Sequence, residues 1–277
     1  MKIFFVISIL VSLFLQQFTQ AAPAQKIIAL SPHSVEMLYA IGAGDRIIAT
    51  LEYSDYPEEA LEIPRIGNYT GIQIEKVIEL QPDLIIGWKS GNKAADLKKI
   101  ESLRFKIFYS HPQNIDEIAL EIIKLGELTG LQENAEAVSI RISAKYHALK
   151  NHFQQYSKVR VFYQLWHDPL RTIGPNNWNE SLINDCNGVN VFHNASTTYP
   201  TVSLEDVLSK NPEVILIPHH SGKAWQKTQI WQKWKNIDAV KNKRIRILDG
   251  DLINRFGPRA VEGLEGLCRA INSARNP

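Results

Sequence analysis

The stretch Ile74–Trp88, IEKVIELQPDLIIGW, returns 130 residues later as Leu204–Pro218, LEDVLSKNPEVILIP. The two copies align without a gap, so that Val77 matches Val207 and the prolines coincide. Each copy reads as a short helix, a turn at the proline and a strand with little polar alternation, which is typical of strands buried in a parallel sheet. The repeat predicts two similar α/β lobes, and a two-lobed protein usually binds its ligand between the lobes.

The segments around the two copies predict alternating strands and helices, the pattern of an α/β fold. In the first half, strands are expected over residues 26–31, 46–50 and 106–109, and helices over 34–41, 93–103 and 115–129. In the second half, strands are expected over 159–166 and 244–250, and helices over 178–186, around Trp225, Trp231 and Trp234, and from 258 onward. The predicted fold is two similar lobes with central parallel sheets and a ligand cleft between them.

The longest periodic segment of the chain lies between the predicted lobes. Apolar residues recur every three or four positions from Leu131 to Tyr156, without an interrupting proline or glycine. This spacing predicts one α-helix of about 25 residues and about 38 Å. Because a continuous helix packed on both lobes limits their swing, unlike a glycine–serine linker, we expect a rigid brace. The expected divisions are an N-terminal lobe over 22–130, the helix over 131–157 and a C-terminal lobe over 158–277.

Residues 1–21 have the features of a secretory signal peptide. Lys2 provides the positive start, the apolar run from Ile3 to Leu15 is short for a membrane anchor, and Ala21 ends a small-residue cleavage site. We therefore expect the mature chain to be exported, without stable insertion in a membrane.

The cysteine content and the charge balance are consistent with export. An even pair of cysteines in an exported protein more often forms a disulfide than a metal site, so Cys186 and Cys268 predict one bridge inside the second lobe. The 31 basic and 29 acidic side chains leave the chain nearly neutral. Nucleic acid is therefore an unfavourable partner, because phosphate binding needs a strong basic excess.

Aromatic residues stand in loops at the expected mouths of both lobes: Tyr53, Tyr69, Trp88, Trp166 and Tyr199. Such rings provide flat surfaces with a polar edge, which suit a bulky ligand that is partly apolar and partly hydrogen-bonding. Each ring taken singly is as well explained by packing in the core or at the rim. Their shared placement favours contact with a ligand.

The polar residues near the expected cleft allow more than one interpretation. Asp251 and Arg255 follow the last predicted strand and could bind amides or a phosphate of a ligand, or form a local salt bridge. His219 and His220 are more simply interpreted as polar loop residues than as metal ligands. The histidines that could meet at the cleft have a spacing that singles out no metal: His33, His167, His219 and His220. The sequence has no nucleophile elbow, phosphate loop or HExxH motif.

Glu75 and Glu205 occupy the same position in the two copies, early in each predicted helix and outside the expected cleft. The helix dipole favours an acid in a first turn, which by itself explains such residues. Their two-fold repetition supports a second interpretation, in which one acid on each lobe docks on a basic partner.

Five stretches together resemble the periplasmic substrate-binding proteins of the helical-backbone class, which supply ABC importers with cobalamin, iron-siderophores, haem or metal ions. The stretches are IALSPHSVEMLYAIG, EYSDYP, IEKVIELQPDLIIGW, SLEDVLSKNPEVILI and DGDLINRFGPR. They are most similar to those of the cobalamin (vitamin B12) receptors, over essentially the whole mature chain. The resemblance implies a non-enzymatic, monomeric periplasmic receptor, without a cofactor of its own, that carries cobalamin to the membrane permease of an ABC importer.

The resemblance also implies roles for particular residues. Corrin contacts fall on Tyr53, Trp88, Asp251, Leu252, Ile253, Asn254 and Arg255, docking acids on Glu75 and Glu205, and the disulfide on Cys186 and Cys268. The chain departs from the family where tyrosines stand at 69 and 199 instead of tryptophans, and where Leu252 and Ile253 replace aromatics. Two alternative functions remain: a haem or iron-siderophore receptor of the same class, and a metal-dependent enzyme built on the histidines.

Overall fold

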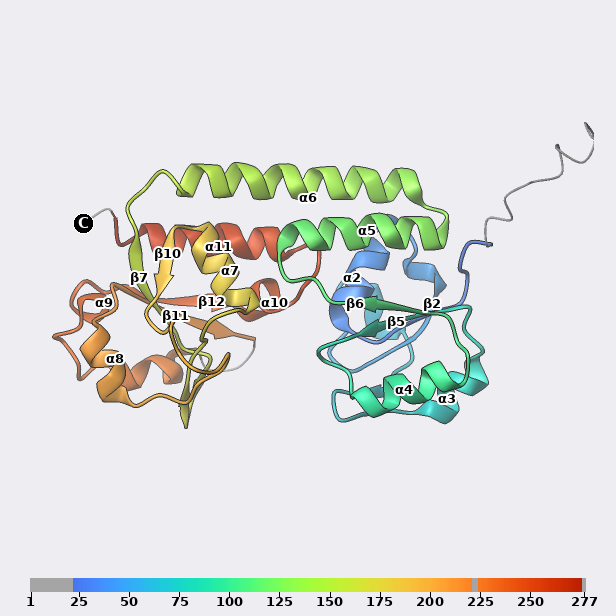
Figure 1. Ribbon diagram of the computed structural model, residues 1–277, viewed down its shortest axis with the longest axis horizontal. Helices are drawn as coiled ribbons and strands as arrows, with labels where there is room; N and C mark the ends of the chain where they lie inside the picture. Colours follow the sequence, from blue (N-terminus) through green and yellow to red (C-terminus); the bar gives the residue numbers. More distant parts are fainter. Residues whose placement is uncertain (1–21, 221–223, 276–277) are drawn as a thin grey trace, which may run out of the picture.

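The computed structural model describes residues 22–220 and 224–275, which form two lobes on the same side of a long helix, α6 (Gln132–Phe153) (Figure 1). Each lobe contains a four-stranded sheet in which every strand pair is parallel. The predicted α/β fold with two similar lobes is therefore confirmed. The predicted signal peptide, residues 1–21, lies outside the described part of the chain.

The N-terminal lobe has the strand order β2-β1-β5-β6. Its strands are β1 (Ile27–Ala29), β2 (Ile47–Thr50), β5 (Leu84–Trp88) and β6 (Ile107–Ser110), with a small hairpin of β3 (Gly67–Asn68) and β4 (Gly71–Ile72). Its helices are α2 (Pro32–Ile41), α3 (Ile74–Leu80), α4 (Ala94–Ser102) and α5 (Ile115–Thr129), with the 3₁₀ helices η1 (Gly44–Arg46) and η2 (Glu58–Glu62).

The C-terminal lobe repeats this order as β10-β7-β11-β12. Its strands are β7 (Val159–Tyr163), β10 (Gly188–Asn190), β11 (Val214–His219) and β12 (Ile245–Asp249), with a hairpin of β8 (Trp166–His167) and β9 (Leu170–Arg171). Its helices are α7 (Trp178–Asp185), α8 (Leu204–Lys210), α9 (Asp238–Lys241), α10 (Gly250–Ile253) and α11 (Ala260–Asn272), with the 3₁₀ helix η3 (Ala224–Trp231).

The sequence repeat is also a structural repeat. Helices α3 and α8 begin and end at positions 130 residues apart, and each leads into the strand third in order in its sheet, β5 or β11. The residue after each helix turns the chain with a positive φ, 46° at Gln81 and 42° at Asn211. Pro82 and Pro212 follow at once and prevent the helix from continuing.

Strands buried on both faces explain why the sequence shows little polar alternation in them. Ile27 and Ala29 of β1 face the largest apolar core, whereas Ile28 of the same strand faces a smaller core on the other side of the sheet. The largest core continues through Ile142 of α6 to Leu264 of α11 in the second lobe. The two lobes therefore share one hydrophobic core through the long helix.

Three elements of the second lobe differ from the predictions. The strand expected over 159–166 ends at Tyr163, because the next residues turn into the β8–β9 hairpin. The helix expected around Trp225, Trp231 and Trp234 is a 3₁₀ helix that ends at Trp231. Strand β10 is an edge strand of three residues and had no pattern long enough to predict it.

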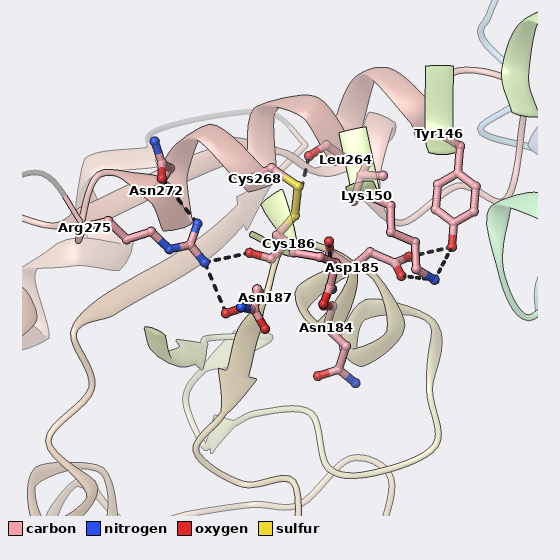
Figure 2. The surroundings of a disulfide bond; sticks show 11 residues. Tyr146, Lys150, Asn184, Asp185, Cys186, Asn187, Leu264, Cys268, Asn272 and Arg275 are labelled. Atoms are coloured by element: carbon pink, nitrogen blue, oxygen red, sulfur yellow. Dashed lines mark hydrogen bonds and ion pairs between the residues drawn. A yellow bond between two sulfur atoms is a disulfide. The ribbon is translucent and has the colours of Figure 1, made fainter. Parts of the chain in front are cut away.

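Helix α6 has 22 residues, about 33 Å at the usual rise, and ends before Tyr156, shorter than predicted. It packs on α5, where a Cβ on Gly126 would lie 2.4 Å from the Cβ of Ala135, so the two helices approach closely. Toward the second lobe, Asp185 of α7 accepts a hydrogen bond from the Tyr146 hydroxyl (2.9 Å) and pairs with Lys150 (2.9 Å) (Figure 2). The helix is thus fastened to both lobes.

We expect this brace to permit only a small rotation of the lobes when a ligand binds, in contrast to receptors that close widely about a hinge. Small-angle X-ray scattering with and without ligand should give nearly the same radius of gyration. A clear decrease on adding ligand would contradict the prediction.

The predicted disulfide joins Cys186, just after α7, to Cys268 of α11, and both residues are fully buried (Figure 2). The Arg275 guanidinium donates to the backbone oxygens of Cys186 (2.8 Å) and Asn187 (3.1 Å), so the segment that follows α11 is held beside the bridge. Within residues 22–220 and 224–275, none of the helices combines the length and hydropathy that a membrane span requires.

Candidate ligand-binding cleft

A cavity of about 610 Å³ lies between the lobes. The first lobe contributes Trp88, the last residue of β5, and Ser90. The remaining lining residues come from the second lobe: Leu165, Arg171, Trp178, Asn179, Tyr199, Asn254 and Phe256. Open α/β sheets bind ligands beyond the carboxyl ends of their strands, and Trp88 stands at such an end.

An aromatic cluster at this cavity contains rings from both lobes. The Trp88 and His33 rings of the first lobe have centroids 5.3 Å apart and lie 5.8 Å and 5.7 Å from the Phe256 ring of the second. Phe256 in turn packs edge-on against Trp178 at 4.9 Å. The cluster gives the cleft an apolar wall that belongs to both lobes.

His33 is the buried member of this cluster and is unsuited to ligand or metal binding. It is 2% exposed, and its Nε2 lies within hydrogen-bond distance of the hydroxyls of Ser31 (3.2 Å) and Ser110 (3.0 Å). Burial lowers the pKa of His33 from 6.5 to about 3, so the ring is neutral at physiological pH.

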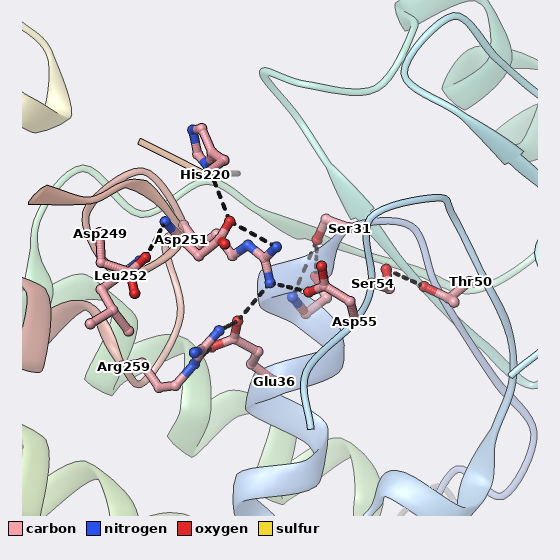
Figure 3. Close-up of polar contacts among 12 residues, drawn as sticks. Ser31, Glu36, Thr50, Ser54, Asp55, His220, Asp249, Asp251, Leu252 and Arg259 are labelled. Carbon is pink, nitrogen blue, oxygen red and sulfur yellow. Dashed lines mark hydrogen bonds and ion pairs between the residues drawn. The ribbon is translucent and has the colours of Figure 1, made fainter. Parts of the chain in front are cut away.

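Ion pairs join the two lobes beside the cleft, and Figure 3 shows their centre at Glu36 and Asp55. Glu36 of α2 is 3% exposed and accepts two hydrogen bonds from Arg259 of the second lobe, at 2.6 and 3.0 Å. Arg255 reaches Asp55 at 2.6 Å and Asp251 at 3.0 Å. A buried acid of one lobe held by an arginine of the other fixes the relative position of the lobes.

The Asp55–Arg255 pair should make a pH-dependent contribution to stability. Burial alone would raise the pKa of Asp55, but the hydrogen bond from Arg255 and its charge lower that pKa below 3.8. Because the folded pKa is the lower one, the contribution is present above 3.8 and is lost as pH falls through the folded value.

We therefore expect Asp55→Asn to destabilise the protein by roughly 0.5 kcal/mol at neutral pH, since the pair is partly exposed. The difference should vanish in acid once Asp55 of the wild type is protonated. Thermal unfolding of both proteins across this pH range measures it, with Glu133→Gln on α6 as the control. A difference that is the same at neutral and strongly acid pH would refute the assignment.

The predicted aromatic residues occupy different parts of this region. Trp88 and Tyr199 line the same cavity. Trp166 lines an adjoining cavity of about 300 Å³. Tyr53 and Tyr69 lie on loops of the first lobe, with 67% and 72% of their surface exposed. The structure thus brings Trp88 and Tyr199 together and leaves the tyrosines of the first lobe as exposed rings.

The segment from Asp251 to Arg255, which follows the last strand as predicted, is partly helical. Residues Gly250–Ile253 form the short helix α10, and the Asp249 carboxylate caps it by accepting from the Asp251 backbone N–H at 2.9 Å. Ile253 is 1% exposed within the core, so its side chain does not line the cleft. Leu252 is half-buried, and Asn254 lines both cavities.

The four histidines do not converge on a metal site. His33 is buried, His167 lies on the β8–β9 hairpin, and His220 contacts Asp251 at 3.0 Å. In the part of the chain that the structure describes, no group of three potential metal-ligating side chains lies together.

Several residues of the cleft were missed by reasoning from the sequence. Trp178 was assigned only to a helix, and Glu36, Asp55 and Arg259 received no role. The sequence did contain an indication for Glu36, because it is the only charged residue in the predicted helix 34–41. Which partner would neutralise it depends on the packing of the lobes, which no local pattern shows.

A second large cavity, of about 630 Å³, lies between the lobes and α6. Helices α2, α6 and α11 line it, together with the loop at Tyr56, and no strand end opens into it. Arg259 in its wall is paired with Glu36, and Lys145 with Glu265 at 2.9 Å. Because no strand end opens into it, we interpret it as a space beside the brace rather than as the candidate ligand site.

Glu75 and Glu205 are exposed and form no ion pair with a residue that the structure describes. Their helices, α3 and α8, lie one on each lobe, on the side of the molecule opposite α6 (Figure 1). The two acids therefore stand away from the brace and are open to a partner on that side.

Two α/β lobes, a bracing helix and an aromatic cleft between the lobes define a ligand-binding protein of the bilobal type. The chain belongs to the periplasmic binding protein family, whose model matches residues 27–252. This is a family of substrate-binding proteins rather than of enzymes.

Among its relatives, the vitamin B12-binding protein of Vibrio campbellii is 37% identical over 254 residues, 91% of each chain. The vitamin B12-binding protein of Vibrio vulnificus is 38% identical over 255 residues, 92% of each chain. The crystal structure of the periplasmic vitamin B12 binding protein of Vibrio cholerae matches with 36% identity and a TM-score of 0.86, over 92% of this chain and 99% of that one. The periplasmic haem-binding protein of Vibrio cholerae, at 18% identity over 88% of this chain and 98% of that one and a TM-score of 0.75, shares the fold alone.

Proposed function

We propose that this protein is a periplasmic receptor that binds cobalamin in the cleft between its lobes and delivers it to the permease of an inner-membrane ABC importer. The observation that carries the proposal is the cleft, where an aromatic wall shared by both lobes adjoins charged and amide side chains. Relatives at 36–38% identity over 91–92% of this chain are vitamin B12-binding proteins.

Cobalamin matches this combination of surfaces. Its corrin is broad and largely apolar on its faces, while amide arms project from its rim. In this proposal Trp88 and Tyr199, which line one cavity, pack on the corrin face, and Tyr53, Tyr69 and Trp166 contact its rim. Of the polar segment, Asn254 lines the cavity, and in this proposal it binds the arms through its amide. Asp251 offers a carboxylate, Arg255 a guanidinium and Leu252 an apolar side chain beside it.

Delivery is assigned to Glu75 and Glu205. They are exposed at equivalent positions on the two lobes, so a permease with two-fold symmetry can meet both with the same basic surface. The signal-like residues 1–21 and the buried disulfide support a location in an oxidising compartment outside the cytoplasm.

Replacement of Trp88 with alanine is expected to weaken cobalamin binding by about 1–3 kcal/mol, because the corrin loses a large aromatic contact. Trp88→Phe should lose less, since a ring remains. Isothermal titration with cyanocobalamin measures the change.

Tyr156→Ala provides the matched control, because this aromatic residue is 40% exposed beyond the end of α6 and away from the cleft. Its affinity should equal that of the wild type. Equal affinities for Trp88→Ala and the wild type would remove Trp88 from the site.

A further inference from the structure

His220 directly follows strand β11 and lines the cavity of about 300 Å³. The other lining residues of that cavity are Leu165, Trp166, Arg171, Pro218 and Asn254. Leu165, Arg171 and Asn254 also line the larger cavity between the lobes, so the two spaces adjoin. The side chain of His220 is 53% exposed, so its ring is accessible to solvent.

A carboxylate orients the His220 ring. Nδ1 lies 3.0 Å from the Asp251 carboxylate, as Figure 3 shows, and Asp251 is itself held by Arg255 at 3.0 Å. A carboxylate on one ring nitrogen fixes the proton there and makes the other nitrogen a stronger electron-pair donor, which is the usual support of metal-binding histidines. Among the residues that the structure describes, the remaining nitrogen, Nε2, has only a long contact of 3.4 Å to the Asn254 amide.

We propose that His220 is an axial ligand for the cobalt of bound cobalamin, with Asp251 as its positioning residue. This assignment rests on the proposed function. Cobalt(III) in cobalamin has one exchangeable axial position, which holds water in aquocobalamin and a firmly bound cyanide in cyanocobalamin. The Nε2 electron pair replaces the water, which leaves as a neutral molecule. The Nδ1 proton stays in its hydrogen bond to Asp251, and no electron is transferred.

His33 and His147 each lack one of these features. His33 is buried beneath the aromatic cluster, so it cannot approach a ligand. His147 has the same exposed fraction, 53%, and a carboxylate at the same 3.0 Å, from Asp116, but lies on α6 away from the cleft. His147 is therefore a matched control: it has the same histidine–carboxylate pair as His220 but lies outside the cleft.

The test is to titrate the full mature protein with aquocobalamin and, separately, with cyanocobalamin, recording absorption spectra and dissociation constants. Bound aquocobalamin should give the spectrum of a reference made from aquocobalamin and free imidazole. His220→Gln should retain the aquo spectrum and bind aquocobalamin about tenfold more weakly relative to cyanocobalamin. His147→Gln should behave as the wild type.

Binding of both corrinoids with the aquo spectrum unchanged in the wild type would overturn the axial assignment and leave the proposed function intact. Failure of both corrinoids to bind would overturn the proposed function and the assignment together. A spectral shift that survives in His220→Gln would assign the ligand to another residue and also refute the proposal. Cyanocobalamin affinity in His220→Gln close to that of the wild type shows that the variant is folded.

Discussion

Simultaneous replacement of Glu75 and Glu205 with alanine is expected to reduce docking on the importer about a hundredfold or more while leaving cobalamin affinity nearly unchanged. A charge-assisted contact contributes about 1.5–3 kcal/mol, and the two acids occupy equivalent exposed positions on α3 and α8. Either single replacement should therefore cost about tenfold. Ligand titration beside transport in reconstituted vesicles separates delivery from capture.

The control for this experiment is the double replacement Glu133→Ala and Glu136→Ala. Both glutamates are exposed on α6, which lies on the opposite side of the molecule from α3 and α8 (Figure 1). This variant removes the same charge and should transport normally. If the Glu75 and Glu205 double variant also transports normally, the two acids only stabilise the starts of their helices.

Loss of the disulfide should have the largest effect on stability. The bridge spans 82 residues, and in the chain-entropy model a loop of that length corresponds to about 4 kcal/mol. We expect Cys186→Ala with Cys268→Ala to lower the free energy of unfolding by roughly this amount, without a change in cobalamin affinity of the folded protein, since the bridge is buried away from the cleft.

Urea unfolding of the double alanine variant measures this loss, and the wild type treated with a reducing agent should reproduce it. If the double alanine variant and the reduced wild type both unfold at the same urea concentration as the oxidised wild type, packing rather than the bridge stabilises the second lobe.

The lobes could be predicted from the sequence because the helix–turn–strand pattern is contained in a short stretch and occurs twice. The repeat and its prolines predicted a short helix at the start of each copy, where α3 and α8 lie, and the unbroken apolar spacing located α6 to within a few residues of its ends. Strand β10 was missed because three residues give no period to recognise. The predicted strand extended to Trp166, because this residue continues an aromatic and apolar run, whereas Trp166 begins the β8–β9 hairpin.

The candidate site was only partly predictable, for a different reason. The location of Trp88 follows from the end of a strand, which a sequence shows. The pairing of Glu36 with Arg259, 223 positions away, follows from how two lobes pack on one helix. The family resemblance implies a corrin contact at Ile253, but this residue is 1% exposed, because α10 turns its side chain into the core.

The most direct test of the central proposal is a fluorescence titration of the purified mature protein with cyanocobalamin, beside haemin and a ferric siderophore. We expect one cobalamin per protein and strong quenching of tryptophan fluorescence, because Trp88 and Trp178 line the cleft. Haemin and the siderophore should bind weakly. Tight haemin binding, with no response to cobalamin, would contradict the proposed function.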